Sequence, residues 1–321
     1  MRIINILKSR LISHSPLALA HHVTSLCNAR CKMCDMWKRS PKHTDDLSRE
    51  EIFGMLDRAK EAGMVGYIAW GGEPLLREDL PEILQFAKKR KFLTMVVTNG
   101  FLLADRCKEI APLTNLLYVS IDSNSSLHDE MRGVEGILKN AIDGIKSCKR
   151  EKVKVSINSV ISSLNLDAVE GLCELSRELD VPIVFEPMQI VSEHNKHLKA
   201  TDEELRIAFS KILKYKRAGY RVDSCTQYLQ NFSKQKQYVC HTAKCYVTVD
   251  AHGNITTCSE NKNWGNIKER AFEELFSSIE FKEFCREAEK CNKCDISCVA
   301  EVSLIYSLSP RFILDTVKSS L

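Results

Sequence analysis

From residue 16 to residue 187, short apolar runs alternate with longer stretches in which apolar residues recur at helical spacing. The short runs are rich in Val, Ile, Leu and aromatic residues, which favour strands. The longer stretches begin with acidic residues and repeat apolar positions about every 3.6 residues, which favours amphipathic helices. The predicted strands are 16–24, 65–70, 92–99, 115–122, 153–161 and 181–187, and the predicted helices between them are 47–63, 77–90, 133–151 and 165–180.

This alternation predicts an α/β domain with a parallel sheet and right-handed crossovers. The pattern leaves open whether the sheet is doubly wound or curled into a barrel. In both arrangements the loops at the C-terminal ends of the strands meet on one face, where active sites form. A further helix at 202–217 completes the unit, so we predict that this domain covers residues 16–220.

The remainder of the chain is short and rich in cysteine. Eight of the 14 cysteines lie from Cys225 onward, around a predicted hairpin at 245–258 and a predicted helix at 268–290. Paired cysteines around a hairpin are typical of a small metal-stabilised domain. We assign this second domain to residues 221–300.

Composition and charge exclude few classes of protein. The chain has 321 residues, 44% of them hydrophobic, and a formal net charge of only +4, which is too small to indicate a nucleic-acid partner. No run reaches the roughly 18 apolar residues that a membrane-spanning helix needs. Because the N-terminus also lacks the uninterrupted apolar run of a secretory signal, we expect a cytoplasmic protein.

The two ends of the chain, residues 1–15 and 301–321, are amphipathic. Such segments pack on the protein, or they lie on a membrane surface and would then admit a lipid substrate. Both interpretations stay open at this point.

Three cysteines, Cys27, Cys31 and Cys34, form the motif C-x3-C-x2-C directly after the first predicted strand. A reducing compartment disfavours a disulfide and leaves a zinc site, a thiol redox pair or an iron–sulfur cluster. A structural zinc site wants four ligands, usually as two separated pairs, whereas closely spaced thiolates hold iron–sulfur clusters. We favour a 4Fe-4S cluster in which three thiolates leave one iron open for a substrate or cosubstrate.

This motif resembles the signature of the radical S-adenosylmethionine (SAM) enzymes. The resemblance implies a partial (β/α)6 TIM-like barrel, followed by a small C-terminal cysteine-rich iron–sulfur domain. It also implies that the open iron binds the amino and carboxylate groups of SAM. One electron then cleaves SAM to methionine and a 5′-deoxyadenosyl radical, which abstracts hydrogen from the substrate. Met33 departs from the aromatic residue that commonly precedes the last cysteine, and this departure leaves the ligands intact.

The segment after the second predicted strand, "WGGEPLL", matches the GGEP segment of the same family. Glycines let the backbone approach a ligand closely, and the resemblance implies that Glu73 binds the SAM amino group. A strand-to-helix turn with an acidic residue near the helix start is the alternative. The cofactor-binding candidates, which stand at or after the ends of four strands, are Gly71, Gly72, Glu73, Pro74, Thr98, Asn99, Ser120, Asp122, Arg132, Ser156 and Asn158.

Turn capping is a competing explanation for Asn99 and Asp122. Arg132 is a candidate partner for a carboxylate. Glu186, at the end of the sixth predicted strand, either reaches the barrel mouth or caps a helix.

The C-terminal cysteines resemble the SPASM and twitch extensions of radical SAM enzymes, which hold auxiliary 4Fe-4S clusters. Cys240 and Cys258 bracket Gly253 in the pattern C-x12-G-x4-C, but C-x2-C-x3-C stands where a full SPASM module has C-x2-C-x5-C-x3-C. We expect one auxiliary cluster and leave a second open, since it would need Cys225 and Cys285 as well. Cys225 is alternatively a hydrogen donor near the substrate, and a zinc ribbon is the alternative for the whole region. The auxiliary ligand candidates are Cys240, Cys245, Cys258, Cys291, Cys294 and Cys298.

These motifs together predict a radical SAM enzyme that abstracts hydrogen from a C–H bond of a peptide, a protein or a cofactor precursor. A lipid or isoprenoid substrate at a membrane surface is one alternative, and a noncatalytic iron–sulfur or zinc protein is another. The expected reductant is a protein such as ferredoxin or flavodoxin.

Overall fold

The computed structural model describes residues 15–39, 45–190, 192–232, 238–258, 262–291, 294 and 296–307. All the cysteines lie within these ranges. The amphipathic ends of the chain lie mostly outside them, so the prediction of a membrane-facing surface there falls outside the described residues.

The described residues form one nine-stranded sheet in the order β6-β5-β4-β3-β2-β1-β7-β8-β9. Neighbouring strands from β6 to β7 are parallel, and the last two pairs are antiparallel. All six strands predicted for the first domain are confirmed. The bounds are β1 Ala18–Thr24, β2 Gly66–Gly71, β3 Leu93–Thr98, β4 Leu116–Ser120, β5 Lys154–Ile161, β6 Ile183–Pro187, β7 Tyr246–Val249, β8 Asn254–Thr257 and β9 Lys262–Asn266.

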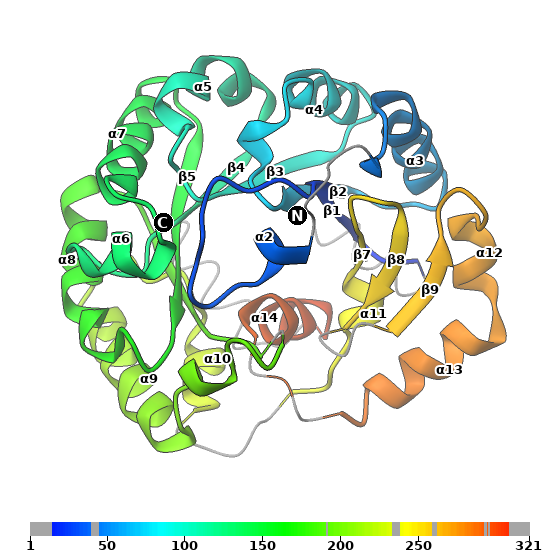
Figure 1. Ribbon diagram of the computed structural model, residues 1–321. Helices are drawn as coiled ribbons and strands as arrows, with labels where there is room; N and C mark the ends of the chain where they lie inside the picture. The colour runs from blue at the N-terminus through cyan, green and yellow to red at the C-terminus, as the bar shows by residue number, and fades with distance from the viewer. Residues whose placement is uncertain are drawn as a thin grey trace.

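Helices follow the parallel strands and cover the outside of the curved sheet, as Figure 1 shows for α3 to α9. The α-helices are α2 Met36–Arg39, α3 Arg49–Glu61, α4 Leu80–Lys89, α5 Leu103–Ile110, α6 Leu127–Arg132, α7 Ile137–Arg150, α8 Val169–Leu179, α9 Asp202–Arg217, α10 Thr226–Gln230, α11 Thr242–Cys245, α12 Phe272–Ser277, α13 Ile279–Ala288 and α14 Ser297–Tyr306. The short 3-10 helices are η3 Pro74–Leu76, η4 Ala111–Leu113, η5 Leu166–Ala168 and η6 Lys196–Leu198. None of the described helices is both long and apolar enough to cross a bilayer.

Local capping explains where the best-predicted helices begin. Ser48 Oγ accepts a hydrogen bond from the Glu51 backbone N–H, and the Glu51 side chain accepts one from the Ser48 N–H, which starts α3. Thr201 and Glu204 form the same capping box at α9. Both helices therefore start where a hydroxyl residue precedes a glutamate by three positions.

The predicted helix at 268–290 is wrong, because the structure has two helices there. Ser278 lies between α12 and α13 with an extended backbone, ψ 149°. Its Oγ accepts a hydrogen bond of 3.2 Å from the Phe281 N–H, which caps the start of α13. The side chain thus competes with continuation of the first helix.

Alternation along the strands divides the sheet into two faces. The outer face carries residues such as Leu19, Tyr67 and Val96, which are fully buried beneath the helices. The residues between them lie on the inner face, and several of them, such as His22, Trp70 and Val97, stay partly exposed. The sheet is therefore the predicted partial barrel, with an outer core and an inner face that solvent reaches.

The C-terminal region is joined to the barrel rather than appended to it. Strand β7 pairs in parallel with β1, so both regions share one sheet. Helix α14 lies between α10 and α11 and packs against both (Figure 1). It also runs across the predicted boundary at residue 300.

Candidate radical SAM site

The three cysteines of the first motif lie on the loop that follows β1. Cys27 Sγ accepts a hydrogen bond from the Ala29 N–H at 3.4 Å, and Cys34 Sγ accepts one from the Met36 N–H at 3.5 Å. Backbone donors aimed at sulfur favour negative charge on it. The loop, residues 25–35, which we call the ligand loop, is therefore shaped to hold thiolates.

Burial opposes ionisation of these thiols in the metal-free chain. It raises the pKa of Cys27 to about 12 and also raises the pKa of Cys31 and Cys34. Iron coordination would remove the three protons and supply the compensating positive charge. Among the described residues, no three His, Cys, Asp or Glu side chains stand close enough together to hold a single ion.

The GGEP segment lies directly against the ligand loop. The Gly72 N–H donates to the Thr24 carbonyl at 3.1 Å, and the Glu73 N–H donates to the Leu26 carbonyl at 2.7 Å. A Cβ at position 72 would stand 1.9 Å from the Leu26 oxygen. Gly71, at the end of β2, has φ +126°. Glycine is thus required at both positions for the two loops to meet.

Glu73 is fully buried and its carboxylate joins the ends of β2 and β3. Oε1 accepts hydrogen bonds from the Thr98 hydroxyl at 2.6 Å and the Leu75 N–H at 3.0 Å, and Oε2 accepts one from the Asn99 N–H at 2.8 Å. Burial raises the pKa of Glu73, and these hydrogen bonds oppose the rise. Pro74 follows as the first residue of η3. The proposed contact of Glu73 with the SAM amino group stays a prediction.

Two asparagines outside the predicted site, Asn28 and Asn195, help to fix the position of the ligand loop. Asn99 Nδ2 donates to Asn28 Oδ1 at 2.7 Å, between two of the cysteines. Asn195, which is fully buried, donates to the Met33 carbonyl at 2.9 Å. Asn28 sits inside the motif and could have been suspected, whereas Asn195 lies in a polar connection after β6 that carries no such signal.

Asp122 and Arg132 form a buried ion pair beside the ligand loop. Arg132 Nε and Nη2 lie 2.8 and 2.7 Å from Asp122 Oδ2, and Asp122 Oδ1 accepts a hydrogen bond of 2.9 Å from the Val160 N–H. Arg132 Nη1 also lies 4.0 Å from Cys31 Sγ. Although burial acts against the guanidinium, Asp122 and Cys31 raise the pKa of Arg132. The predicted carboxylate partner of Arg132 is thus Asp122 itself in this structure.

Candidates on β4 and β5 reach the inner face. Ser120 pairs with Asn158 across these strands. Asn158 Nδ2 donates to Glu186 Oε1 at 3.0 Å, and the Ser297 hydroxyl of α14 donates to Glu186 Oε2 at 3.1 Å. Ser156 differs, because its hydroxyl donates to the Pro182 carbonyl at 3.2 Å. Glu186 therefore faces the barrel, joined to a helix from the C-terminal region.

The inner face near α14 is rich in acidic groups. Burial, followed by the charges of Glu301, Asp223 and Glu186, raises the pKa of Tyr118 to about 12. Burial raises the pKa of Glu301 itself to about 7, although its carboxylate accepts a hydrogen bond from the Cys225 N–H. Carboxyl groups from β6, α14 and the segment before α10 therefore surround one tyrosine.

The thiol of Cys225 has a structural partner. It caps α10 by accepting a hydrogen bond of 3.3 Å from the Tyr228 N–H. The side chain is buried. Its proposed role as a hydrogen donor stays a prediction.

Cys240 interacts electrostatically with three other C-terminal cysteines. Burial, followed by the neighbouring thiols of Cys258, Cys291 and Cys294, raises the pKa of Cys240 to about 11. Cys258 has φ +68°, a left-handed conformation that turns the chain after β8. These four cysteines offer the number of thiolates that one cluster needs.

The other two predicted ligands also have thiol neighbours in this group. Cys245 is buried beside Leu17 and Tyr306, and its thiol interacts electrostatically with Cys240. Cys298 is exposed, its sulfur lies 3.6 Å from the Tyr246 hydroxyl, and it interacts electrostatically with Cys294. Cys285 is buried within α13.

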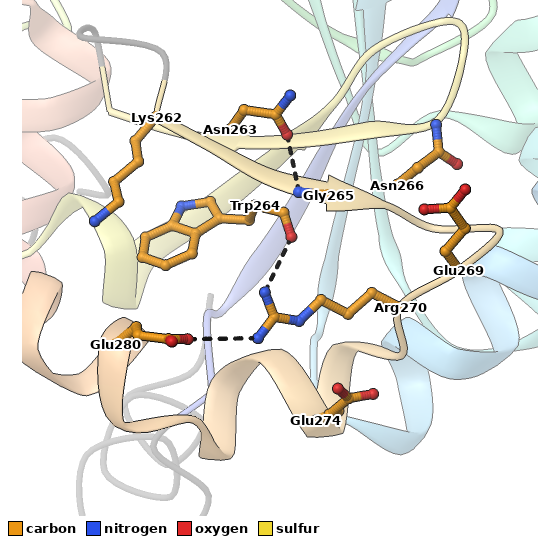
Figure 2. Close-up of a pocket in the computed structure, with 9 residues that line it drawn as sticks. All are labelled: Lys262, Asn263, Trp264, Gly265, Asn266, Glu269, Arg270, Glu274 and Glu280. Atoms are coloured by element: carbon orange, nitrogen blue, oxygen red, sulfur yellow. Dashed lines mark hydrogen bonds and ion pairs between the residues drawn. The ribbon is translucent and has the colours of Figure 1, made fainter.

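A separate groove of about 520 Å³ lies at the outer edge of the sheet, between β9 and the helices α12 and α13 (Figure 2). Lys262 Nζ lies 4.5 Å from the centroid of the Trp264 ring, and Arg270 donates to the Trp264 carbonyl at 3.2 Å. Strand β9 is three positions from β1 in the sheet. None of the residues that line the groove belongs to the predicted site.

Comparison with known proteins agrees with this geometry. Residues 22–176 match the model of the radical SAM superfamily, and residues 240–295 match an iron–sulfur cluster-binding domain, SPASM. The Fe-coproporphyrin III synthase of Methanosarcina barkeri is 28% identical over 165 residues, which are 50% of this chain and 41% of that protein. The AdoMet-dependent heme synthase of the same organism is 24% identical over 314 residues, which are 88% of this chain and 90% of that protein.

Among solved structures, SuiB of Streptococcus suis bound to S-adenosylmethionine has a TM-score of 0.72 at 18% identity. The match covers 96% of this chain and 78% of SuiB. SuiB has also been solved with its precursor peptide SuiA. At this identity the likeness concerns the fold: a partial barrel with a cysteine-rich C-terminal region. With its cysteine loop, its GGEP segment and both matched regions, this chain belongs to the radical SAM superfamily and carries a C-terminal SPASM iron–sulfur domain.

Proposed function

We propose that this protein cleaves SAM reductively and uses the 5′-deoxyadenosyl radical to abstract hydrogen from a C–H bond of a peptide or protein substrate. When bound, a 4Fe-4S cluster with one open iron would supply the electron and the SAM site. The observation that carries the proposal is the contact between the ligand loop, the GGEP segment and Arg132. Cys27, Cys31 and Cys34 would hold the cluster.

The residues around the loop supply positioning. Glu73 ties the ends of β2 and β3 together, so Thr98 and Asn99 keep a fixed position beneath the loop. Arg132 places positive charge beside Cys31, which favours a thiolate there. We propose that the Ser120 and Asn158 side chains contact SAM from the inner face, as the family resemblance implies.

For the auxiliary site we propose one 4Fe-4S cluster held by Cys240, Cys258, Cys291 and Cys294. The interaction of the Cys240 thiol with the other three supports this set. Cys245 lies in an apolar environment, and Cys298 lies near Glu186 on the inner face.

The acidic inner face supports a peptide substrate. Glu186 and Glu301 belong to different regions of the chain, yet both lie near Tyr118. Carboxylates favour substrates that bring cations or N–H donors, such as peptide amides and basic side chains, and they repel other carboxylates. Lys216 offsets part of this charge, because it lowers the pKa of both Asp223 and Glu301.

A cofactor precursor is the second candidate, because a relative that matches 88% of this chain is a heme synthase. The two candidates make opposite demands on the inner face. A porphyrin with several carboxylates needs cations there, and a peptide does not.

The test uses protein reconstituted with iron and sulfide, SAM and dithionite. We expect 5′-deoxyadenosine from the wild-type chain and none from the variant in which Cys27, Cys31 and Cys34 are all alanine. Retained 5′-deoxyadenosine in that variant would refute the site assignment. A Cys258→Ala variant should still cleave SAM but form no product.

Substrate class is tested in the same assay by adding a mixture of short basic peptides or Fe-coproporphyrin III. Peptide-dependent stimulation of SAM cleavage, with a mass change in the peptide, supports the first candidate. Turnover of the porphyrin alone would replace it with the second.

A further inference from the structure

The outer side of the ligand loop is basic. From residue 25 to residue 39 the sequence has four basic residues, two Lys and two Arg, against one acidic residue, Asp35. Arg30, Lys32 and Lys38 are exposed, whereas Asp35 is 7% exposed. The loop that would carry the cluster therefore presents positive charge to solvent.

A tryptophan lies in the middle of this charge. The Trp37 ring, on α2, is partly exposed, with Arg30 Cζ 5.2 Å and Lys38 Nζ 5.0 Å from its centroid. Its Nε1–H donates to the Cys34 carbonyl at 3.0 Å. A single hydrogen bond thus joins a ring that solvent reaches to the backbone of a cluster ligand.

The neighbouring segment does not cancel the positive charge. Lys38 Nζ lies 3.1 Å from His194 Nδ1, which brings the segment after β6 to the edge of the basic surface. The nearby Glu193 is paired with Lys196. We call Arg30, Lys32, Trp37 and Lys38 the basic loop surface.

We propose that the basic loop surface is the docking site for an acidic one-electron carrier protein, and that the electron enters through Trp37. The inference rests on the proposed function, since it assigns the source of the electron for that site. Opposite charges speed the encounter of two proteins and fix their orientation. In each event the carrier loses one electron and the cluster gains one, with no bond broken and no proton moved in this chain.

A charge-reversal variant tests the docking surface. Lys32→Glu with Lys38→Glu reverses two exposed charges, and Arg30 is left intact because it donates to the Cys27 and Ala29 carbonyls within the loop. The matched control is Lys89→Glu with Lys146→Glu, two exposed lysines on the outer helices α4 and α7.

Photoreduced flavodoxin and reduced ferredoxin serve as probes, and bleaching of the cluster's visible absorption reports reduction. At low ionic strength we expect reduction of the Lys32/Lys38 variant to slow by about ten-fold or more, with weaker carrier binding by calorimetry. Added salt should slow the wild type and the control but change the variant little. Dithionite should reduce all three proteins alike.

Trp37→Phe tests the entry point, because it keeps a ring and removes the hydrogen bond to Cys34. We expect carrier affinity within about two-fold of the wild type and a limiting rate of reduction several-fold lower. An unchanged electron paramagnetic resonance spectrum after dithionite would establish that the cluster is intact.

Equal carrier-driven reduction of the wild type and the Lys32/Lys38 variant would overturn the docking surface. So would a wild-type chain that neither binds nor accepts electrons from either carrier. An unchanged limiting rate in Trp37→Phe would overturn the route. Failure of the proposed function is distinct, because it would appear as absence of SAM cleavage with dithionite in the wild type.

Discussion

Removing the guanidinium of Arg132 should destabilise the folded chain strongly, because it leaves a buried carboxylate without its counter-ion. Asp122 is fully buried, and apart from Arg132 the hydrogen bond that its side chain receives is the one from the Val160 N–H, at 2.9 Å. His128 Nδ1 lies 4.0 Å away, but burial lowers the pKa of His128 to about 4, so it is neutral at pH 7. Removing one partner of a buried ion pair costs about 3–5 kcal/mol, and we expect Arg132→Met to lower the free energy of unfolding by that amount.

The assay is urea denaturation of the metal-free chain at pH 7, with unfolding monitored by tryptophan fluorescence. Combining Arg132→Met with Asp122→Asn should raise the free energy of unfolding by about 2 kcal/mol relative to the single variant, because the unpaired buried charge is then removed.

A loss below about 1 kcal/mol for Arg132→Met would contradict this account of the ion pair. A double variant no more stable than the single one would do the same, since the cost would then not come from the carboxylate.

Three further predictions concern other parts of the chain. Gly72→Ala should displace the ligand loop and lower iron loading in reconstituted protein, whereas Gly54→Ala, in open space on α3, should load normally and gain about 0.5–1 kcal/mol in urea denaturation. Because burial raises the folded-state pKa of Glu301 from its ordinary value of 4.5 to about 7, the folded chain loses stability as the pH rises between these values, by about 3 kcal/mol. Glu301→Gln should remove that slope in a series of urea curves, and an unchanged slope would contradict the assignment. Cys258→Ala should lose about four irons per chain by iron assay while Cys285→Ala loses none, and equal losses would refute the choice of ligands.

The strands and the main helices were predictable because burial on one face imposes a repeating apolar pattern. Helices α5 and α6 were missed, since both are short and follow strand ends that were interpreted as parts of the site. The break at Ser278 was missed because an apolar pattern continues across it, while a single hydroxyl cap decides the local backbone. Apolar periodicity thus reports the buried face and not the hydrogen bonds that end a helix.

The site was predictable where chemistry demands fixed spacing on one loop, as for Cys27, Cys31, Cys34 and the GGEP segment. It was not predictable where the contact joins distant segments. Asn195 reaches the ligand loop across 162 positions of sequence, and a lone asparagine in a polar connection gives no hint of this. Cys245 and Cys298 have the spacing of ligands, and our proposal leaves them out because of the packing around them.

The pairing of β7 with β1 gives the C-terminal region a protective role for the whole fold. Without β7, residues 18–21 of β1 would present unpaired backbone amides and carbonyls along a nearly complete parallel sheet. Such an exposed edge recruits strands from other molecules and promotes aggregation. A chain shortened to the barrel should therefore be prone to self-association. The iron–sulfur region covers the edge of the strand that leads into the cysteine loop and so protects it from pairing with other molecules.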